Sequence, residues 1–247
     1  MKGQLSIVEL LLGRGALPDL RDARGWTPLH NAVINDHGDV AKLLLKTGKV
    51  NASAANLDGN TPLHFACVTD NERLLELLLG VLERDKTDVN LQNKQVLTPL
   101  HHATGNGCVG TVNLILQQKE TDRNISDRNG FTPLFEAVIL NRIKVVKLLI
   151  NDPATNPNIQ GLSGYTPIHY GAQRGYINTI DTLLDDDRVE VNLRENEGRT
   201  PISLAAGEGC VEAVEVLIMN DGVDIDLADN NGWTPLQWAQ EKRRREE

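Results

Sequence analysis

A histidine and a glutamate are the residues in this 247-residue sequence whose types and spacing come nearest to acid–base chemistry. His102 and Glu136 are one 34-residue interval apart, and an imidazole and a carboxylate within hydrogen-bond reach of a substrate can move protons. The sequence contains no Walker loop, HExxH, GxSxG or glycine-rich dinucleotide motif to supply a nucleophile or a metal. We therefore predict no catalytic residues, and we keep a small-molecule or catalytic site built on His102 and Glu136 as an alternative hypothesis.

An acidic run, Asp185-Asp186-Asp187, is the other candidate for chemistry. It lacks the alternating oxygen ligands and the glycine of a calcium-binding EF-hand loop. We interpret it as a solvated turn or as an electrostatic patch for a basic partner. The basic run from Lys242 to Arg245 is flanked by acids and is interpreted as a capping helix. No metal and no cofactor are expected.

Composition excludes several classes of partner. The formal charge of −9 argues against broad nucleic-acid binding, which requires a basic surface. No apolar run approaches the length of a membrane span, so no membrane insertion is expected. Three widely spaced cysteines without a CxxC pair are typical of reduced thiols, which predicts an intracellular protein of the cytoplasm or nucleus.

A Thr-Pro pair recurs through the whole chain and must position these side chains. Seven threonines follow one another at intervals of 34 or, once, 37 residues: Thr27, Thr61, Thr98, Thr132, Thr166, Thr200 and Thr234. A fixed period of this size indicates a solenoid, in which each unit buries its apolar face against its neighbours.

Residues 127–160 show how one unit is built. The turn Asp127-Arg128-Asn129-Gly130 leads to Thr132, a predicted helix N-cap, and Pro133 stands at the first helical position. We expect a short helix over 133–140, a polar corner, and a second helix with apolar residues at helical spacing around 145–150.

The recurring Thr-Pro-Leu-His pattern, complete at residues 27–30, 61–64 and 98–101, resembles the signature of the ankyrin-repeat family. The resemblance implies an all-α ankyrin-repeat solenoid of helix-turn-helix units with β-turn fingers, in which fingers and first helices line a concave groove. It also implies a single domain, 1–247, with half repeats at 1–21 and 229–247. The six full repeats are predicted at 22–55, 56–92, 93–126, 127–160, 161–194 and 195–228.

Several positions depart from the pattern. The signature histidine, which in the family braces the turn, is replaced by Phe135, Ser203 and Gln237, so we expect threonine and proline alone to brace those turns. Val96 replaces the finger glycine, and because a β-branched residue resists positive φ, we expect that finger to be distorted. The three extra residues are expected within 80–87, where they lengthen a helix or its loop. The half repeats indicate either a segment of a longer protein or a pair of caps.

The resemblance implies a protein-binding scaffold or adaptor, without enzymatic activity, that recognises an unidentified protein or peptide partner through the groove. Aromatic and arginine side chains dominate interface energetics, and they cluster at the groove positions of the repeat. The predicted partner-binding residues are Trp26, Phe65, His102, Phe131, Glu136, Tyr165, Tyr170, Arg174, Arg199, Trp233 and Trp238. A structural spacer within a longer multidomain protein is a further alternative.

Overall fold

The computed structural model describes residues 2–246, with side chains from residue 5 to residue 241. These residues form fourteen α-helices and no β-strand. The chain divides into two compact units, unit 1 up to Asp122 and unit 2 from Arg123, and each unit is described by itself.

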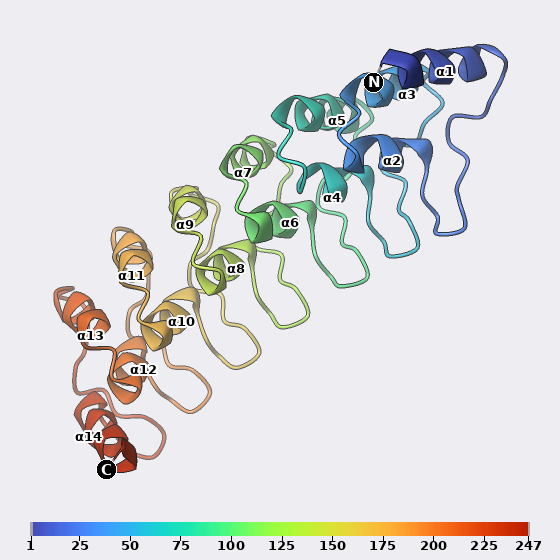
Figure 1. Ribbon diagram of the computed structural model, residues 1–247. Coiled ribbons are helices and arrows are strands. Elements are labelled where there is room, and N and C mark those ends of the chain that lie inside the picture. Colours follow the sequence, from blue (N-terminus) through green and yellow to red (C-terminus); the bar gives the residue numbers. More distant parts are fainter. Residues whose placement is uncertain (1, 247) are drawn as a thin grey trace. The chain divides into compact units, whose positions relative to one another are not determined.

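Each unit contains three helix pairs and one further helix, which is α1 in unit 1 and α14 in unit 2. Unit 1 contains α1 (Lys2–Gly13), α2 (Pro28–Ile34), α3 (Gly38–Lys46), α4 (Pro62–Ala66), α5 (Glu72–Arg84), α6 (Pro99–Asn106) and α7 (Val109–Leu116). Unit 2 contains α8 (Pro133–Ile139), α9 (Ile143–Ile150), α10 (Pro167–Arg174), α11 (Ile177–Leu184), α12 (Pro201–Glu208), α13 (Val211–Ile218) and α14 (Pro235–Glu246). The even-numbered helices of unit 1 pack in one row and the odd-numbered helices in another (Figure 1). Unit 2 by itself likewise has one row of even-numbered helices and one row of odd-numbered helices, so the predicted all-α solenoid is confirmed.

We call the helix that follows each Thr-Pro pair the first helix and the helix after the corner the second helix. From α2 to α12, every first helix begins at its proline, and the threonine before it is the N-cap in an extended conformation. Proline is well placed there because the missing N–H has no intrahelical partner in any case.

The signature histidine joins one repeat to the next. The backbone N–H of Thr61 donates to Nδ1 of His64 at 3.1 Å, and Nε2 of the same ring lies 3.1 Å from the carbonyl oxygen of Leu97 in the following repeat. Nδ1 therefore accepts and Nε2–H donates. Burial lowers the pKa of this imidazole to about 4, which keeps the ring neutral in this role.

Two of the three repeats without this histidine still have a side chain that braces the turn. The hydroxyl groups of Ser203 and Thr200 lie 3.0 Å apart, and Oε1 of Gln237 accepts the backbone N–H of Thr234 at 2.8 Å. The expectation that threonine and proline alone brace these turns was therefore wrong at both positions, because the Ser203 hydroxyl and the Gln237 amide oxygen each reach the N-cap threonine. Phe135 offers no acceptor, and its ring stacks on Phe131 instead, with centroids 4.3 Å apart.

The finger that carries Val96 is regular. Val96 adopts the left-handed conformation, with φ of 67°, and its N–H donates to the carbonyl oxygen of Asn93 at 2.9 Å. The expected distortion was wrong: hydrogen bonds of the turn, including those to the Asn93 side chain, hold the valine in a conformation that it disfavours.

The three extra residues lengthen α5 as expected. This helix has thirteen residues, whereas α7 has eight. Its added turn and the following loop form one side of a pocket of about 800 Å³, and residues 117–120 form the other side.

Replacement of Val96 by glycine is expected to raise the free energy of unfolding by about 1 kcal/mol, because glycine adopts positive φ without the steric cost that valine carries. Urea denaturation measures the change. The reverse substitution, Gly232→Val at the same position of another finger, is the control: a Cβ there meets no atom within 4 Å, so its expected loss isolates the backbone cost. A destabilised Val96→Gly protein would contradict the strain assigned to this finger.

The buried histidines predict a loss of stability in acid. The unfolded chain takes up a proton on His64 below the ordinary pKa of 6.5, whereas the folded imidazole stays neutral down to about 4. Stability is therefore fully present above pH 6.5 and falls as the pH approaches 4, by roughly 3 kcal/mol for this residue at most. His64→Gln, which copies the natural Gln237, should flatten this slope in urea titrations between pH 7.5 and 4.

His37→Gln provides the matched control, because this half-exposed histidine lies outside the threonine–histidine pairs. Its pH profile should run parallel to that of the unchanged protein. A parallel profile for His64→Gln as well would exclude the assigned role of burial.

Candidate functional site

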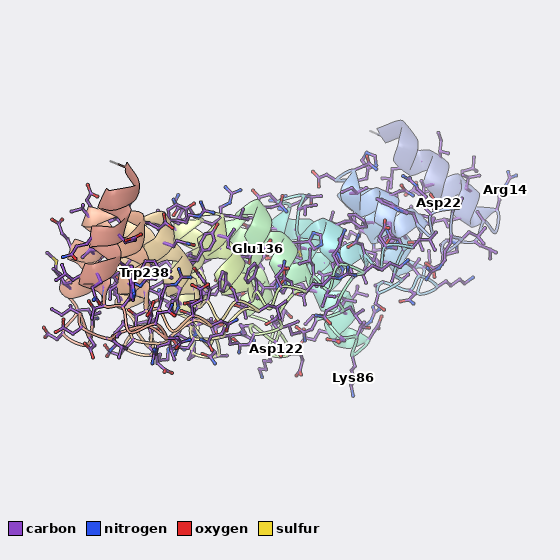
Figure 2. The ribbon with its side chains drawn as sticks, turned by 90° about the horizontal axis from the view of Figure 1, so that it is seen from below. Arg14, Asp22, Lys86, Asp122, Glu136 and Trp238 are labelled. Carbon is purple, nitrogen blue, oxygen red and sulfur yellow. The ribbon has the colours of Figure 1, made fainter. Side chains whose placement is uncertain are left out.

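The predicted site residues occupy two recurring positions of the repeat. Five precede a threonine directly and five stand four residues after one; Arg174 lies eight residues after Thr166. All are half-buried except Arg174, which is exposed. In each unit they lie on the side of the fingers and first helices, which we call the inner face. Figure 2 labels Glu136 and Trp238 among the side chains of unit 2.

In unit 1 the aromatic pair of the inner face spans two repeats. The rings of Trp26 and Phe65 lie 4.7 Å apart, and the guanidinium group of Arg24 lies 5.1 Å above the Trp26 ring. His30 contacts Phe65 edge-on at 5.9 Å. The residue before one threonine therefore packs on the residue four places after the next threonine.

His102 takes part in a structural network of unit 1. Its Nε2 lies 3.2 Å from the side-chain amide nitrogen of Asn93, and its ring packs edge-on against His64 at 5.3 Å. Burial lowers the pKa of His102, which favours the neutral imidazole. A neutral ring that contacts the finger asparagine fits a positioning role on the inner face.

In unit 2 a chain of rings crosses two repeats. Phe131 stacks on Phe135, whose ring lies 6.2 Å from Tyr170. The guanidinium group of Arg174 lies 5.2 Å from the centroid of the Tyr170 ring, and Tyr176 contacts the same ring at 6.5 Å. These contacts fix the tyrosine ring and leave it half-exposed.

A second group in unit 2 combines rings with charges. Arg199 lies 5.5 Å from the Trp238 ring and forms ion pairs with Glu195 at 3.1 Å and Glu197 at 3.0 Å. Trp233 lies 5.2 Å from Trp238. Nε1 of Trp238 donates to Asp229 at 3.1 Å. The position of Tyr165 beside the signature histidine of its own repeat, at 5.7 Å from His169, extends this surface.

Glu136 is the exceptional residue of unit 2. Its Oε2 is buried without a hydrogen-bond partner among the described residues, and burial, with the negative charge of Asp127, raises its pKa to about 7. Such a carboxyl group changes charge near neutral pH. His102 belongs to unit 1 and Glu136 to unit 2, so the acid–base pair stays a hypothesis.

Sequence reasoning missed the residues that hold the predicted ones in place. Phe135, Tyr176 and Asp229 each contact a predicted site residue, and Asp229 is buried. The 34-residue period gives no signal for these three residues. It relates only recurring positions, such as those of Trp26 and Phe65, which are 39 residues apart and in contact. The acidic run is held locally, because Arg188 pairs with Asp186 at 2.6 Å.

Comparison with known proteins identifies the repeat. The family model described as ankyrin repeats (3 copies) matches residues 1–87, 80–161 and 168–246. A 60-residue stretch, 24% of this chain, is 42% identical to protein phosphatase 1 regulatory subunit 27 of Mus musculus and 40% identical to that of Homo sapiens. The match spans 38% of the length of each of these proteins.

A solved structure shares the fold. The ankyrin repeat domain of Bcl-3, described as a unique member of the IkappaB protein family, matches with a TM-score of 0.79 at 24% identity. The match covers 87% of this chain and 94% of that domain.

Among the described helices, none combines the length and apolar character that crossing a bilayer requires.

Glu136→Gln is expected to stabilise the protein at alkaline pH. Since the folded carboxyl has a pKa of about 7 and the unfolded one an ordinary value of 4.5, wild-type stability falls as the pH rises from 4.5 through 7. The neutral amide avoids the cost of burying a charge, so the variant should gain on the order of 1–3 kcal/mol at pH 8 and nothing near pH 4.5. Urea titrations at both pH values measure this difference. Glu212→Gln, on an exposed part of α13, should change neither; a pH-independent effect of Glu136→Gln would refute the assignment.

Proposed function

Because the chain belongs to the ankyrin-repeat family, we propose that it is a protein-binding scaffold that recognises a partner protein or peptide through the inner face. The observation that carries the proposal is the set of half-exposed rings that neighbouring repeats and arginines hold in fixed positions, such as Tyr170 beneath Arg174. Rings fixed before binding lose little side-chain entropy when a partner covers them.

The charges of the inner face suit an extended segment with both apolar and polar side chains. Trp238, with Arg199 across its face, provides a flat surface for a side chain of the partner. Glu197, which forms one of the two ion pairs of Arg199, is exposed and can also pair with a basic group of the partner. Affinity would come from the rings, and orientation from the surrounding charges.

The comparisons support a role without catalysis. The matched mouse and human proteins are named as regulatory subunits of protein phosphatase 1, which makes an enzyme one kind of partner to test. We also propose an intracellular location, since Cys67 is a buried free thiol.

Site-specific photo-crosslinking tests the surface directly. A crosslinking residue at Tyr170 on the inner face should capture the physiological partner in cells, whereas the same residue at Lys147, exposed on second helix α9, should not. Mass spectrometry identifies the crosslinked protein. Equal capture from both positions, or capture from Lys147 alone, would place the binding surface elsewhere.

With the partner purified, Tyr165→Ala/Tyr170→Ala is expected to weaken binding at least tenfold, because these rings supply buried apolar contact area. Isothermal titration calorimetry measures the dissociation constant, and circular dichroism checks that the variant is folded. Lys144→Ala/Lys147→Ala, two exposed positions on α9, is the matched control and should bind normally. Unchanged affinity in the folded tyrosine variant would contradict the proposal.

A further inference from the structure

Exposed large apolar side chains gather at the two ends of the repeat series. Of the thirteen among the described residues, three lie singly in different repeats, at Leu57, Leu140 and Leu162. Five lie before the first full repeat: Ile7, Leu10, Leu11, Leu17 and Leu20. Five lie in the last full repeat or in α14: Val211, Ile218, Met219, Ile225 and Leu236.

At the C-terminal end, the surface has the form that a second helix covers elsewhere. Leu236 stands two residues after its threonine and is 67% exposed. The residues in the same position of the six full repeats are 0–3% exposed: Leu29, Leu63, Leu100, Leu134, Ile168 and Ile202. A mostly apolar pocket of about 470 Å³ lies beside Leu236, lined also by Ala205, Val214 and Ile218. α14 is a first helix whose second helix is not among the described residues.

At the N-terminal end a second helix is present, and its first helix is not among the described residues. This second helix is α1, which packs on α3. The ends of α1 and α3 align through their closing hydrogen bonds, because the N–H of Arg14 donates to the carbonyl of Leu11 as that of Thr47 does to Leu44. Leu11 is 53% exposed, whereas Leu44 is 2% exposed. Among the described residues, each end therefore has the helix that completes the other.

The hydrogen bonds between neighbouring fingers end in complementary groups. In each unit a backbone hydrogen bond joins the fingers of neighbouring repeats. The donor is the N–H of the residue four places before a threonine, such as Asn230. The acceptor is the carbonyl oxygen of the residue three places before the preceding threonine, here Glu197, at 3.0 Å. At the two ends of this series, the corresponding groups are the N–H of Ala23 and the carbonyl of Asn231. Both residues are exposed, and a second copy can join them.

A second series of bonds runs through the loops after the second helices. Asn192 Oδ1 accepts the N–H of Asp224 at 2.9 Å, and Asp19 Oδ2 accepts that of Asn51 at 3.3 Å. By the same spacing, the acceptor at the C-terminal end is the exposed Asp226, and the donor at the N-terminal end is the N–H of Leu17.

We propose that copies of this chain associate head to tail, with α1 of one copy in the second-helix position beside α14 of the next. The two helices then form one ankyrin repeat from two chains. Full burial of the ten exposed side chains would cover roughly 1,000 Å² of apolar surface, which is about the lower limit for a specific interface.

This interface is heterologous, because two different surfaces meet. Every copy keeps one end open after the first contact, so association continues into chains unless the rotation closes a ring. The interaction does not use the inner face, and it stands or falls independently of partner binding there.

Sedimentation velocity on the unmodified 247-residue chain tests the proposal. The weight-average mass should rise continuously between about 1 and 300 µM, with an apparent dissociation constant on the order of micromolar. Leu11→Glu and Leu236→Glu each place a charge in one of the two surfaces, at a position already exposed, and each variant alone should stay monomeric.

An equimolar mixture of the two variants is the decisive sample. Leu11→Glu retains an intact C-terminal surface and Leu236→Glu an intact N-terminal surface, so the mixture should form dimers and nothing larger.

Leu162→Glu, at an exposed leucine away from both ends, is the matched control and should associate as the unmodified chain does. Circular dichroism melting curves verify folding of every variant. A monomer at all concentrations for the unmodified chain, or a mixture that stays monomeric, overturns the proposal and assigns the end surfaces to further repeats or another protein. Self-association of either single variant indicates a symmetric contact and overturns it as well.

Discussion

The bridge from a threonine through a histidine to the next repeat is the interaction on which the regular stacking depends. In His64 one ring nitrogen accepts a bond from the helix N-cap and the other lies at a carbonyl of the following repeat. His30 and His169 form the same bridge. The bridge ties the start of a helix to the position of its neighbour, so local capping and the stacking of repeats become one constraint. It requires a neutral imidazole, and burial provides one.

In the repeat that follows Thr132 the bridge is absent, and contacts between aromatic rings take its place. Phe135 replaces the histidine, and its ring fills the space with Phe131 and Tyr170. The hydrogen bond from the histidine to the next repeat is replaced by ring contacts, and the rings of Phe131 and Tyr170 remain half-exposed. The aromatic surface of unit 2 is therefore a consequence of a structural substitution, which links the stability of this repeat to its capacity for binding.

The fold followed from the sequence because its determinants are local and repeated. The threonine N-caps, the prolines after them and the longer α5 could be placed from spacing alone. The errors arose where neighbours decide: hydrogen bonds to Asn93 hold Val96 at positive φ, and Gln237 takes over the acceptor role of a histidine. Positions on the inner face were predictable from the period, but the burial of Glu136 depends on packing that one sequence does not reveal.

The main chain and the side chains contribute to recognition at different surfaces. Inside each unit, backbone groups of the fingers pair with those of the next repeat, as Asn196 does with Ser163 and Asn230 with Glu197. A partner on the inner face therefore meets side chains, and selectivity there rests on rings and charges that differ between repeats. At the ends, backbone groups such as the Asn231 carbonyl remain available beside apolar positions that all repeats share. A repeat surface favours another repeat in this arrangement, because only a unit with the same period matches the apolar positions and the backbone bonds at once.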